Sequence, residues 1–248
     1  MRHFFIFLWC VMILSCDAQK IPNNSNPVSH DIWNGLLQKN VDANGHVNYK
    51  GFKSEEAQLE KYLNILRAAH PNTDKWSKDE RLAYWINAYN AFTVALIIKN
   101  YPCKSIKDLG GAIYKVNTPW DIKFITIQGI TYDLNNIEHD IIRKEFNEPR
   151  IHFAVNCASV SCPNLRNEAF VASRLNEQLD DQARKFINDK SKNNISANNA
   201  QLSKLFTWFK GDFTKQGTVV AFINKYSTVK LSEKAKIDYL EYNWNLNE

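Results

Sequence analysis

Glycine and proline are scarce in this chain, with 8 and 7 of them among 248 residues. So low a content excludes a long flexible or proline-rich linker. There is also no internal repeat at a fixed period, which excludes solenoid and propeller architectures. The 44% of hydrophobic residues is enough apolar mass for a real core, so we expect a globular domain.

Blocks of like charge are missing as well. The formal net charge of +5 is spread among acidic residues, with no run of five or six like charges. No platform of basic and aromatic side chains stands out either. A nucleic-acid partner is therefore not expected, and the surface reads as mildly basic and solvated.

The N-terminus has the pattern of an export signal. Arg2 and His3 precede an apolar run over residues 4–14, and a small residue, Ser15, follows. This run is shorter than the about 20 apolar residues that span a bilayer. We therefore expect residues 1–15 to be a signal peptide, residues 16–27 a polar tether and residues 28–248 a single globular domain.

The residues before Cys16 resemble a bacterial lipobox, which reads Ile-Leu-Ser-Cys over residues 13–16. This resemblance implies that Cys16 is lipidated and becomes the first mature residue. The chain would then be a membrane-anchored lipoprotein of the bacterial cell envelope, with the membrane as a partner through its lipid. The alternative is ordinary cleavage after Ala18, which would give a periplasmic or secreted protein.

Apolar spacing predicts more helices than strands. Helices are expected over residues 28–38, from 54 to 66, over 74–99, after 135, over 170–187, after 203 and over 219–226. Strands are expected over 46–49, 123–127, 130–132 and 150–156, with a further hairpin over 195–202. The fold class is therefore α+β, a helix-rich single domain with a small antiparallel sheet.

Two asparagines, Asn87 and Asn90, lie inside the longest predicted helix. Asparagine is a poor residue for a helix interior because its amide competes for backbone groups. Either each amide binds a neighbouring loop, as buried amides normally do, or one of them orients a catalytic histidine.

Reactive side chains are densest between residues 138 and 162. Glu138 and His139 lie on a predicted helix, His152 on the predicted strand, and Cys157 and Cys162 in the loop after it. In an extended strand His152 and Cys157 point to opposite faces, so they can pair only if the chain turns just before the cysteine.

Three chemistries fit these residues. Cys157 can be a nucleophile whose thiolate is favoured by a nearby imidazole. Alternatively, Cys157 and Cys162 form a disulfide, which export permits and which leaves no nucleophile. A zinc site with His139 and His152 is the third, although the spacing matches no standard zinc pattern.

Three segments of the chain resemble the family called domain of unknown function 547. They read YWINAYNA over residues 84–91, IEHDIIR over 137–143 and PRIHFAVNCAS over 149–159. The family pattern implies roles for Glu138, His139, His152 and Cys157. Cys162 is less general in the family, which favours a thiol site or a buried structural thiol over a disulfide alone. The resemblance is compatible with a distantly papain-like fold, but both histidines precede Cys157, so the usual order would have to be rearranged.

The leading hypothesis is a cell-envelope hydrolase or acyl-transfer enzyme that acts on peptide, amide or ester bonds. Its candidate catalytic residues are Cys157, His139, His152, Glu138, Asn87 and Asn90. Cys157 would be the nucleophile, a histidine the general base, and the glutamate or an asparagine the orienting group. No cofactor or metal is required. The alternative is a non-catalytic envelope module that binds a small molecule, a peptide or a glycan.

Overall fold

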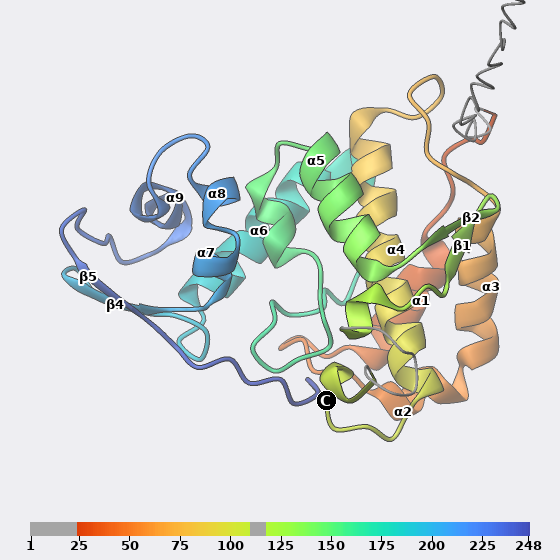
Figure 1. The fold of residues 1–248 in the computed structure, drawn as a ribbon, viewed down its shortest axis with the longest axis horizontal. Helices are drawn as coiled ribbons and strands as arrows, with labels where there is room; N and C mark the ends of the chain where they lie inside the picture. Colours follow the sequence, from red (N-terminus) through yellow and green to blue (C-terminus); the bar gives the residue numbers. More distant parts are fainter. Residues whose placement is uncertain (1–23, 110–117) are drawn as a thin grey trace, which may run out of the picture.

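The computed structural model describes residues 24–109 and 118–248 (Figure 1). The predicted signal peptide, the lipidation site Cys16 and the alternative cleavage after Ala18 lie outside the described residues, as does most of the predicted tether. Within the described part, no helix combines the length and the apolar character needed to cross a membrane. The division of the chain at residues 15 and 27 stays a prediction.

Four helices form the first part of the chain. They are α1 (Asp31–Asn40), α2 (Tyr49–Ser54), α3 (Glu56–Arg67) and α4 (Lys78–Lys99). The helices predicted from apolar spacing over 28–38, 54–66 and 74–99 are thereby confirmed. Ser77 and Glu80 form a capping box, which sets the start of α4 at Lys78 because it satisfies free backbone N–H groups there.

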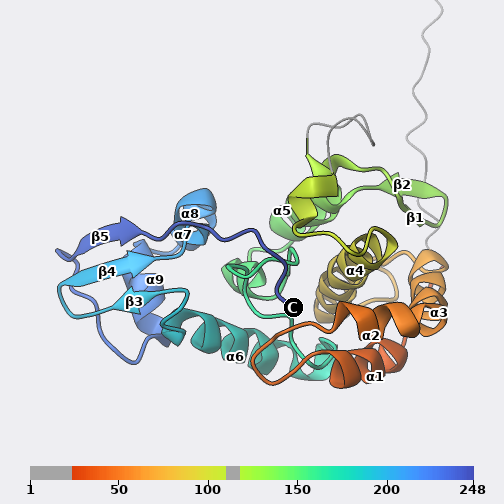
Figure 2. The same cartoon turned by 90° about the horizontal axis from the view of Figure 1, so that it is seen from below.

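Helix α4 is the central element of this part. Figure 2 shows it beside α2 and α3, against which it packs. Side chains on all its faces are buried, including those of Tyr84, Tyr89 and Phe92. Burying a side chain of this size contributes about 1.5–3 kcal/mol, so α4 anchors the larger of two hydrophobic clusters.

A two-stranded hairpin covers one edge of this cluster. β1 (Ile125–Ile127) pairs antiparallel with β2 (Ile130–Tyr132), and Ile127 lies opposite Ile130. The two turn residues, Gln128 and Gly129, both have positive φ (50° and 79°). Such a turn matches the twist of the flanking strands, so the hairpin predicted from the Gln-Gly pair is confirmed.

The strand predicted over residues 150–156 is wrong, because the chain there forms the 3₁₀ helix η4 (Pro149–Phe153). The helix expected after residue 135 is present as the π-helix η3 (Asn136–Ile142), followed by α5 (Arg143–Glu145). Pro149 suits a first helical turn, and the Glu148 side chain caps it by accepting from the N–H of Arg150. Residues 151–155 are all buried, so the side chains do not alternate between core and solvent as a strand requires.

The strand predicted over residues 46–49 is also wrong. Val47 makes only an isolated bridge to Val41. Asn48 caps the next helix by accepting from the N–H of Gly51, which draws Tyr49 into α2. Further 3₁₀ turns are η1 (Ile106–Leu109), η2 (Pro119–Asp121) and η5 (Ala172–Arg174).

The C-terminal half of the chain adds further helices and a second, mixed sheet. Its helices are α6 (Leu175–Asn188), α7 (Leu205–Trp208), α8 (Lys210–Phe213) and α9 (Val219–Tyr226). Its strands are β3 (Asn194–Ile195), β4 (Asn199–Leu202) and β5 (Lys236–Tyr239). The predicted β3–β4 hairpin is confirmed, whereas β5, which joins β4 in parallel, was not expected.

The two halves lie at opposite ends of the molecule, joined by α6 and by the chain between residues 136 and 170 (Figures 1 and 2). After β5 the chain returns to the first half. Leu246 makes a bridge to Ser159, and the Val47 N–H donates to the Asn247 carbonyl at 2.8 Å. The helix-rich α+β class is confirmed, with a small antiparallel sheet beside the mixed one. A papain-like relation stays a prediction.

Candidate functional site

A cavity of about 280 Å³ opens where α4, η3, the loop after η4, α7 and the returning C-terminal segment meet. This volume is close to the lower end of the range for small-molecule sites. Its aromatic lining consists of Tyr89, Trp120, Trp208, Phe209, Tyr242 and Trp244. Its polar lining includes Thr118, Asn135, Glu138, His139, His152, Cys157 and Cys162. The structure therefore brings four of the six candidate catalytic residues into one cavity.

His152 is held by a carboxylate that the sequence analysis did not single out. Its Nε2 lies 2.8 Å from Oδ2 of Asp212, which the short helix α8 carries. The ring of His152 stacks on Phe209 with 3.9 Å between centroids, and its side chain is fully buried. Burial lowers the pKa of His152, so the neutral imidazole is the favoured form.

The other ring nitrogen of His152, Nδ1, is buried and has no hydrogen-bond partner among the described residues. Because Asp212 is a carboxylate, we assign the proton of the neutral ring to Nε2, where it is donated to Oδ2. Nδ1 then carries the free lone pair. A buried polar atom without a partner is costly, so Nδ1 of this cavity-lining residue is short of one hydrogen-bond donor.

Arg143 connects the second histidine to the same carboxylate. Its Nε donates to Asp212 Oδ2 at 2.6 Å, and one of its terminal nitrogens donates to His139 Nδ1 at 2.9 Å. The guanidinium also lies over the Phe209 ring, 5.0 Å from its centroid. The hydrogen bond from His152 and then the one from Arg143 hold the pKa of Asp212 well below its usual range. Asp212 is therefore a permanent anion between two donors.

Glu138 contributes the carboxylate of the cavity. It lies on the π-helix η3 and is buried, and it forms no ion pair with any described residue. Burial first, and then the neighbouring Glu138 carboxylate, raise the pKa of Tyr89 well above its usual value. Glu138 thus places negative charge against an aromatic wall, with no cation of the described chain paired to it.

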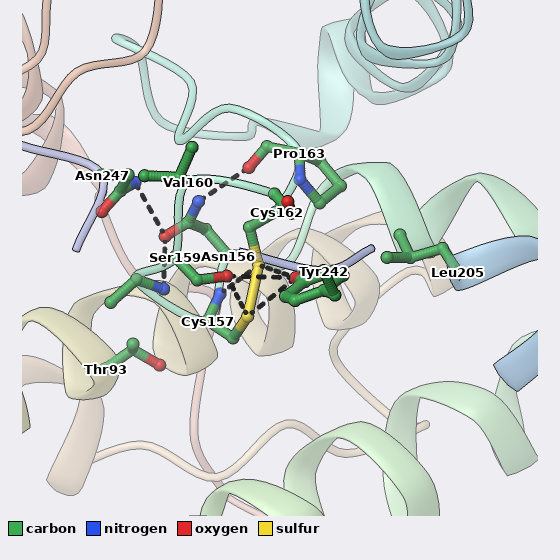
Figure 3. The surroundings of a disulfide bond; sticks show 12 residues. Thr93, Asn156, Cys157, Ser159, Val160, Cys162, Pro163, Leu205, Tyr242 and Asn247 are labelled. Atoms are coloured by element: carbon green, nitrogen blue, oxygen red, sulfur yellow. Dashed lines mark hydrogen bonds between the residues drawn. A yellow bond between two sulfur atoms is a disulfide. The ribbon is translucent and has the colours of Figure 1, made fainter. Parts of the chain in front are cut away.

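Cys157 and Cys162 are joined in a disulfide whose Cα atoms lie 6.3 Å apart (Figure 3). The chain turns between them at Ala158, which has a φ of 60° and donates its N–H to the Asn156 side chain at 2.8 Å. The Tyr242 hydroxyl lies 3.3 Å from the Cys162 sulfur and 3.5 Å from the Cys157 sulfur. The second of the three chemistries is therefore the one present, and this form of the protein has no thiolate at Cys157.

The turn expected just before Cys157 lies after it instead, at Ala158. The lack of a strand over residues 150–156 nevertheless removes the objection that His152 and Cys157 face opposite sides. Both residues line the same cavity. Cys103 is the one unpaired cysteine in the described part of the chain, and burial raises its pKa. Among residues 24–109 and 118–248, no three His, Cys, Asp or Glu side chains are placed to hold a metal ion together.

The two helix asparagines bind loops instead of lining the cavity. Asn87 donates to the carbonyl of Phe170 at 2.8 Å and accepts from the N–H of the same residue at 3.0 Å. Asn90 donates to the Ala154 carbonyl at 2.9 Å and accepts from the Asn156 N–H at 2.8 Å. In each amide both the nitrogen and the oxygen bind a buried backbone group, which explains the two asparagines as structural links from α4 to the site loops.

The aromatic residues around the cavity form a connected cluster. Tyr242 lies between Trp208 and Trp244, with centroid distances of 4.8 and 4.4 Å. Trp120 meets Trp244 edge to face at 5.6 Å. Trp208 is 47% exposed, which is high for so large an apolar side chain. These rings form the mouth of the cavity.

Sequence reasoning missed Asp212 and the aromatic mouth. A partial signal existed, because residues 208–213 and 239–244 are rich in aromatic side chains. Nothing in the sequence showed that these segments fold back onto His152 and Cys157, since Asp212 is 60 positions from His152 and Tyr242 is 85 positions from Cys157.

A comparison with protein families matches residues 73–187 to the family described as "Protein of unknown function, DUF547". The matched segment contains all six candidate catalytic residues, but not Asp212 or the aromatic residues from 208 on. No curated protein and no solved structure matches the chain significantly.

Proposed function

Taking residues 73–187 as a DUF547 domain, we propose that the protein is a hydrolase for amide or ester bonds whose general base is His152. The observation that carries the proposal is the unpartnered Nδ1 of a buried, neutral imidazole in a cavity wall, with Asp212 on the opposite nitrogen. A carboxylate that fixes one ring nitrogen leaves the other free to accept a proton in the reaction.

In the disulfide form the nucleophile is water. Nδ1 of His152 takes a proton from a water molecule as its oxygen attacks the carbonyl carbon of the substrate. The same proton then passes to the leaving nitrogen or oxygen as its bond to carbon breaks. Asp212 stabilises the imidazolium that exists between the two transfers, and Arg143 keeps that carboxylate ionised.

The thiol-dependent version of this proposal requires the reduced protein. A dithiol reductant supplies two electrons and two protons, which convert the Cys157–Cys162 disulfide into two thiols. His152 then takes the proton of the Cys157 thiol, the thiolate attacks the carbonyl carbon, and the imidazolium returns the proton to the leaving nitrogen or oxygen as its bond to carbon breaks. The acyl thioester that results is hydrolysed by water or transferred to an acceptor.

The expected place of action is the bacterial cell envelope. That proposal depends on the export signal and on lipidation of Cys16, or on cleavage after Ala18 without a lipid. An exported location also permits the disulfide. Metabolic labelling with a radioactive fatty acid would test the anchor, since Cys16→Ala should abolish the label.

Hydrolysis of a p-nitrophenyl ester and of a p-nitroanilide tests the reaction. We expect Asp212→Asn to lower kcat by about 100-fold or more, because the imidazole loses its orienting carboxylate. Asp238→Asn is the matched control, since Asp238 lies exposed on β5. Equal rates for both variants would overturn the role of His152 and Asp212.

Redox state separates the two nucleophiles in the same assay. If water attacks, the rate is unchanged by a dithiol reductant and by Cys157→Ser. If the thiol attacks, the rate appears only after reduction and is lost in Cys157→Ser. Absence of hydrolysis in both redox states, across esters and amides, would overturn the proposed function.

A second candidate is a non-catalytic envelope module that binds its ligand in the same cavity. Two observations favour it: the disulfide removes the thiol, and aromatic side chains line the cavity, with Trp208 exposed at 47%. In this case Asp212→Asn should leave ligand affinity unchanged, and no turnover should occur.

A further inference from the structure

The described residues that line the cavity include one carboxylate and no lysine or arginine. The carboxylate is that of Glu138. The negative charge of Glu138 contributes, after burial, to raising the pKa values of both Tyr89 and Tyr242. Those two tyrosines line the cavity from α4 and from the C-terminal segment, so the field of this carboxylate reaches both. A ligand that enters meets a negative potential.

Most aromatic rings of the mouth stand at an angle to their neighbours. Tyr242 stands at 48° to Trp208 and at 46° to Trp244, and Trp120 at 68° to Trp244, whereas Trp208 and Trp244 are nearly parallel, with 24° between their planes. Both faces and edges of the rings therefore border the same space.

Two cationic side chains that do not line the cavity make cation–π contacts with its aromatic rings. Lys107 places its Nζ 4.6 Å from the centroid of Trp244, and Arg143 lies over Phe209. The electron-rich faces of aromatic rings attract cations, and more strongly where water is excluded. The faces of Trp120, Trp208 and Tyr242 have no such partner among the described residues.

We propose that the cavity binds an alkylammonium group, with Glu138 as its counter-ion and the rings of Trp120, Trp208 and Tyr242 around its methyl or methylene groups. This inference deepens the proposed function, because it names the substrate class for the same cavity. The volume of about 280 Å³ corresponds to roughly nine water molecules, which is enough for a quaternary ammonium headgroup or the end of a lysine side chain.

Calorimetry with choline and with its neutral isostere, 3,3-dimethylbutan-1-ol, tests the charge preference. The two probes have nearly the same shape, so a difference in affinity reports the positive charge. We expect choline to bind about tenfold or more tightly than the isostere at low salt. Equal affinities, or no binding of choline, would overturn the inference.

Variants of two glutamates locate the effect. Glu138→Gln should remove most of the preference for choline while leaving the affinity for the neutral isostere unchanged. Glu145→Gln is the matched control, because Glu145 lies on the adjoining α5, outside the cavity lining. A preference that survives Glu138→Gln would overturn the role of this carboxylate, and thermal melting would confirm that both variants are folded.

Further probes distinguish the source of the ammonium group and the competing ligand class. Tighter binding of Nα-acetyl-lysine methylamide than of choline would indicate a peptide substrate. Tighter binding of choline would indicate a quaternary ammonium group, either free or carried by a lipid. Binding of chito-oligosaccharides without binding of either cation would overturn the inference in favour of a glycan. Since these are equilibrium measurements, a failure to bind cations is separate from a failure to hydrolyse esters or amides.

Discussion

His152 and Asp212 are hydrogen-bonded at 2.8 Å although 60 positions separate them in the chain. One comes from a 3₁₀ turn within the family-matched segment, the other from a four-residue helix beyond it. Their pairing fixes the tautomer of His152 and leaves its second nitrogen facing no partner in the described chain. The following predictions depend on this arrangement and on the disulfide next to it.

Hydrolysis should persist below the pH at which an ordinary histidine is protonated. Burial lowers the pKa of His152, and a general base is active only while it is unprotonated. The acid limb of kcat/KM should therefore be centred below pH ~6.5, the value for an exposed histidine. A limb centred at or above that pH would mean that His152 is not the base.

Asp212 should stabilise the fold at neutral pH but not in acid. Its pKa is held low in the folded protein by His152 and Arg143. A carboxyl with a depressed pKa stabilises the native state above its ordinary value near 4 and loses that contribution as the pH falls below it. Asp212→Asn should cost about 1.5–3 kcal/mol in urea unfolding at pH 7, the range for hydrogen bonds to charged groups.

The same urea series at pH 5 and pH 3 provides the check. The difference between the wild-type protein and Asp212→Asn should stay nearly constant from pH 7 to pH 5 and shrink at pH 3. A difference that grows in acid would mean that the Asp212 carboxyl is not the depressed group.

Asn90→Ala should destabilise the protein without a specific effect on the reaction. The substitution leaves the Ala154 carbonyl and the Asn156 N–H buried and unpaired, at a cost of about 2–4 kcal/mol together. Chemical unfolding measures the loss. The rate per folded molecule should stay within a few-fold of the wild type, whereas a loss like that of Asp212→Asn would restore Asn90 as an orienting residue.

Alkylation should distinguish the three cysteines in the described part of the chain. Of these, iodoacetamide should label only Cys103 in the native protein, and slowly, because that thiol is half-buried and burial raises its pKa. After reduction, Cys157 should react faster than Cys162, which is only 4% exposed. Peptide mass spectrometry gives the sites.

The variant Cys162→Ser checks the same arrangement without a reductant. It should leave Cys157 free, and labelling at that position should then appear in the native protein. Rapid labelling of Cys157 in the untreated wild type would contradict the disulfide.

Local sequence patterns predicted many of the helices and strands correctly. Apolar residues at helical spacing located α1, α3, α4, α6 and α9, and the Gln-Gly turn located β1 and β2. The error at residues 150–156 has a physical origin. A run that is buried on every side looks the same in a strand and in a short helix, and Pro149 was the signal that favoured the turn.

Only those site residues that lie close together in the sequence could be predicted. Glu138, His139, His152 and Cys157 lie close in sequence, and short loops keep them close in space. Asp212 reaches His152, and Tyr242 reaches the cavity, through the packing of the C-terminal half, which depends on tertiary contacts that no local pattern contains. The sequence also left open whether Cys157 is a thiol or half of a disulfide, since that depends on the Cα separation across the turn at Ala158.

The returning segment after β5 has a consequence for how the protein matures. Tyr242 and Trp244 line the cavity from positions that are synthesised after all its other lining residues. Until this segment docks, His152 and the two cysteines are therefore more open to solvent. Sulfur pairing can be finished at that stage, before the aromatic side chains cover it.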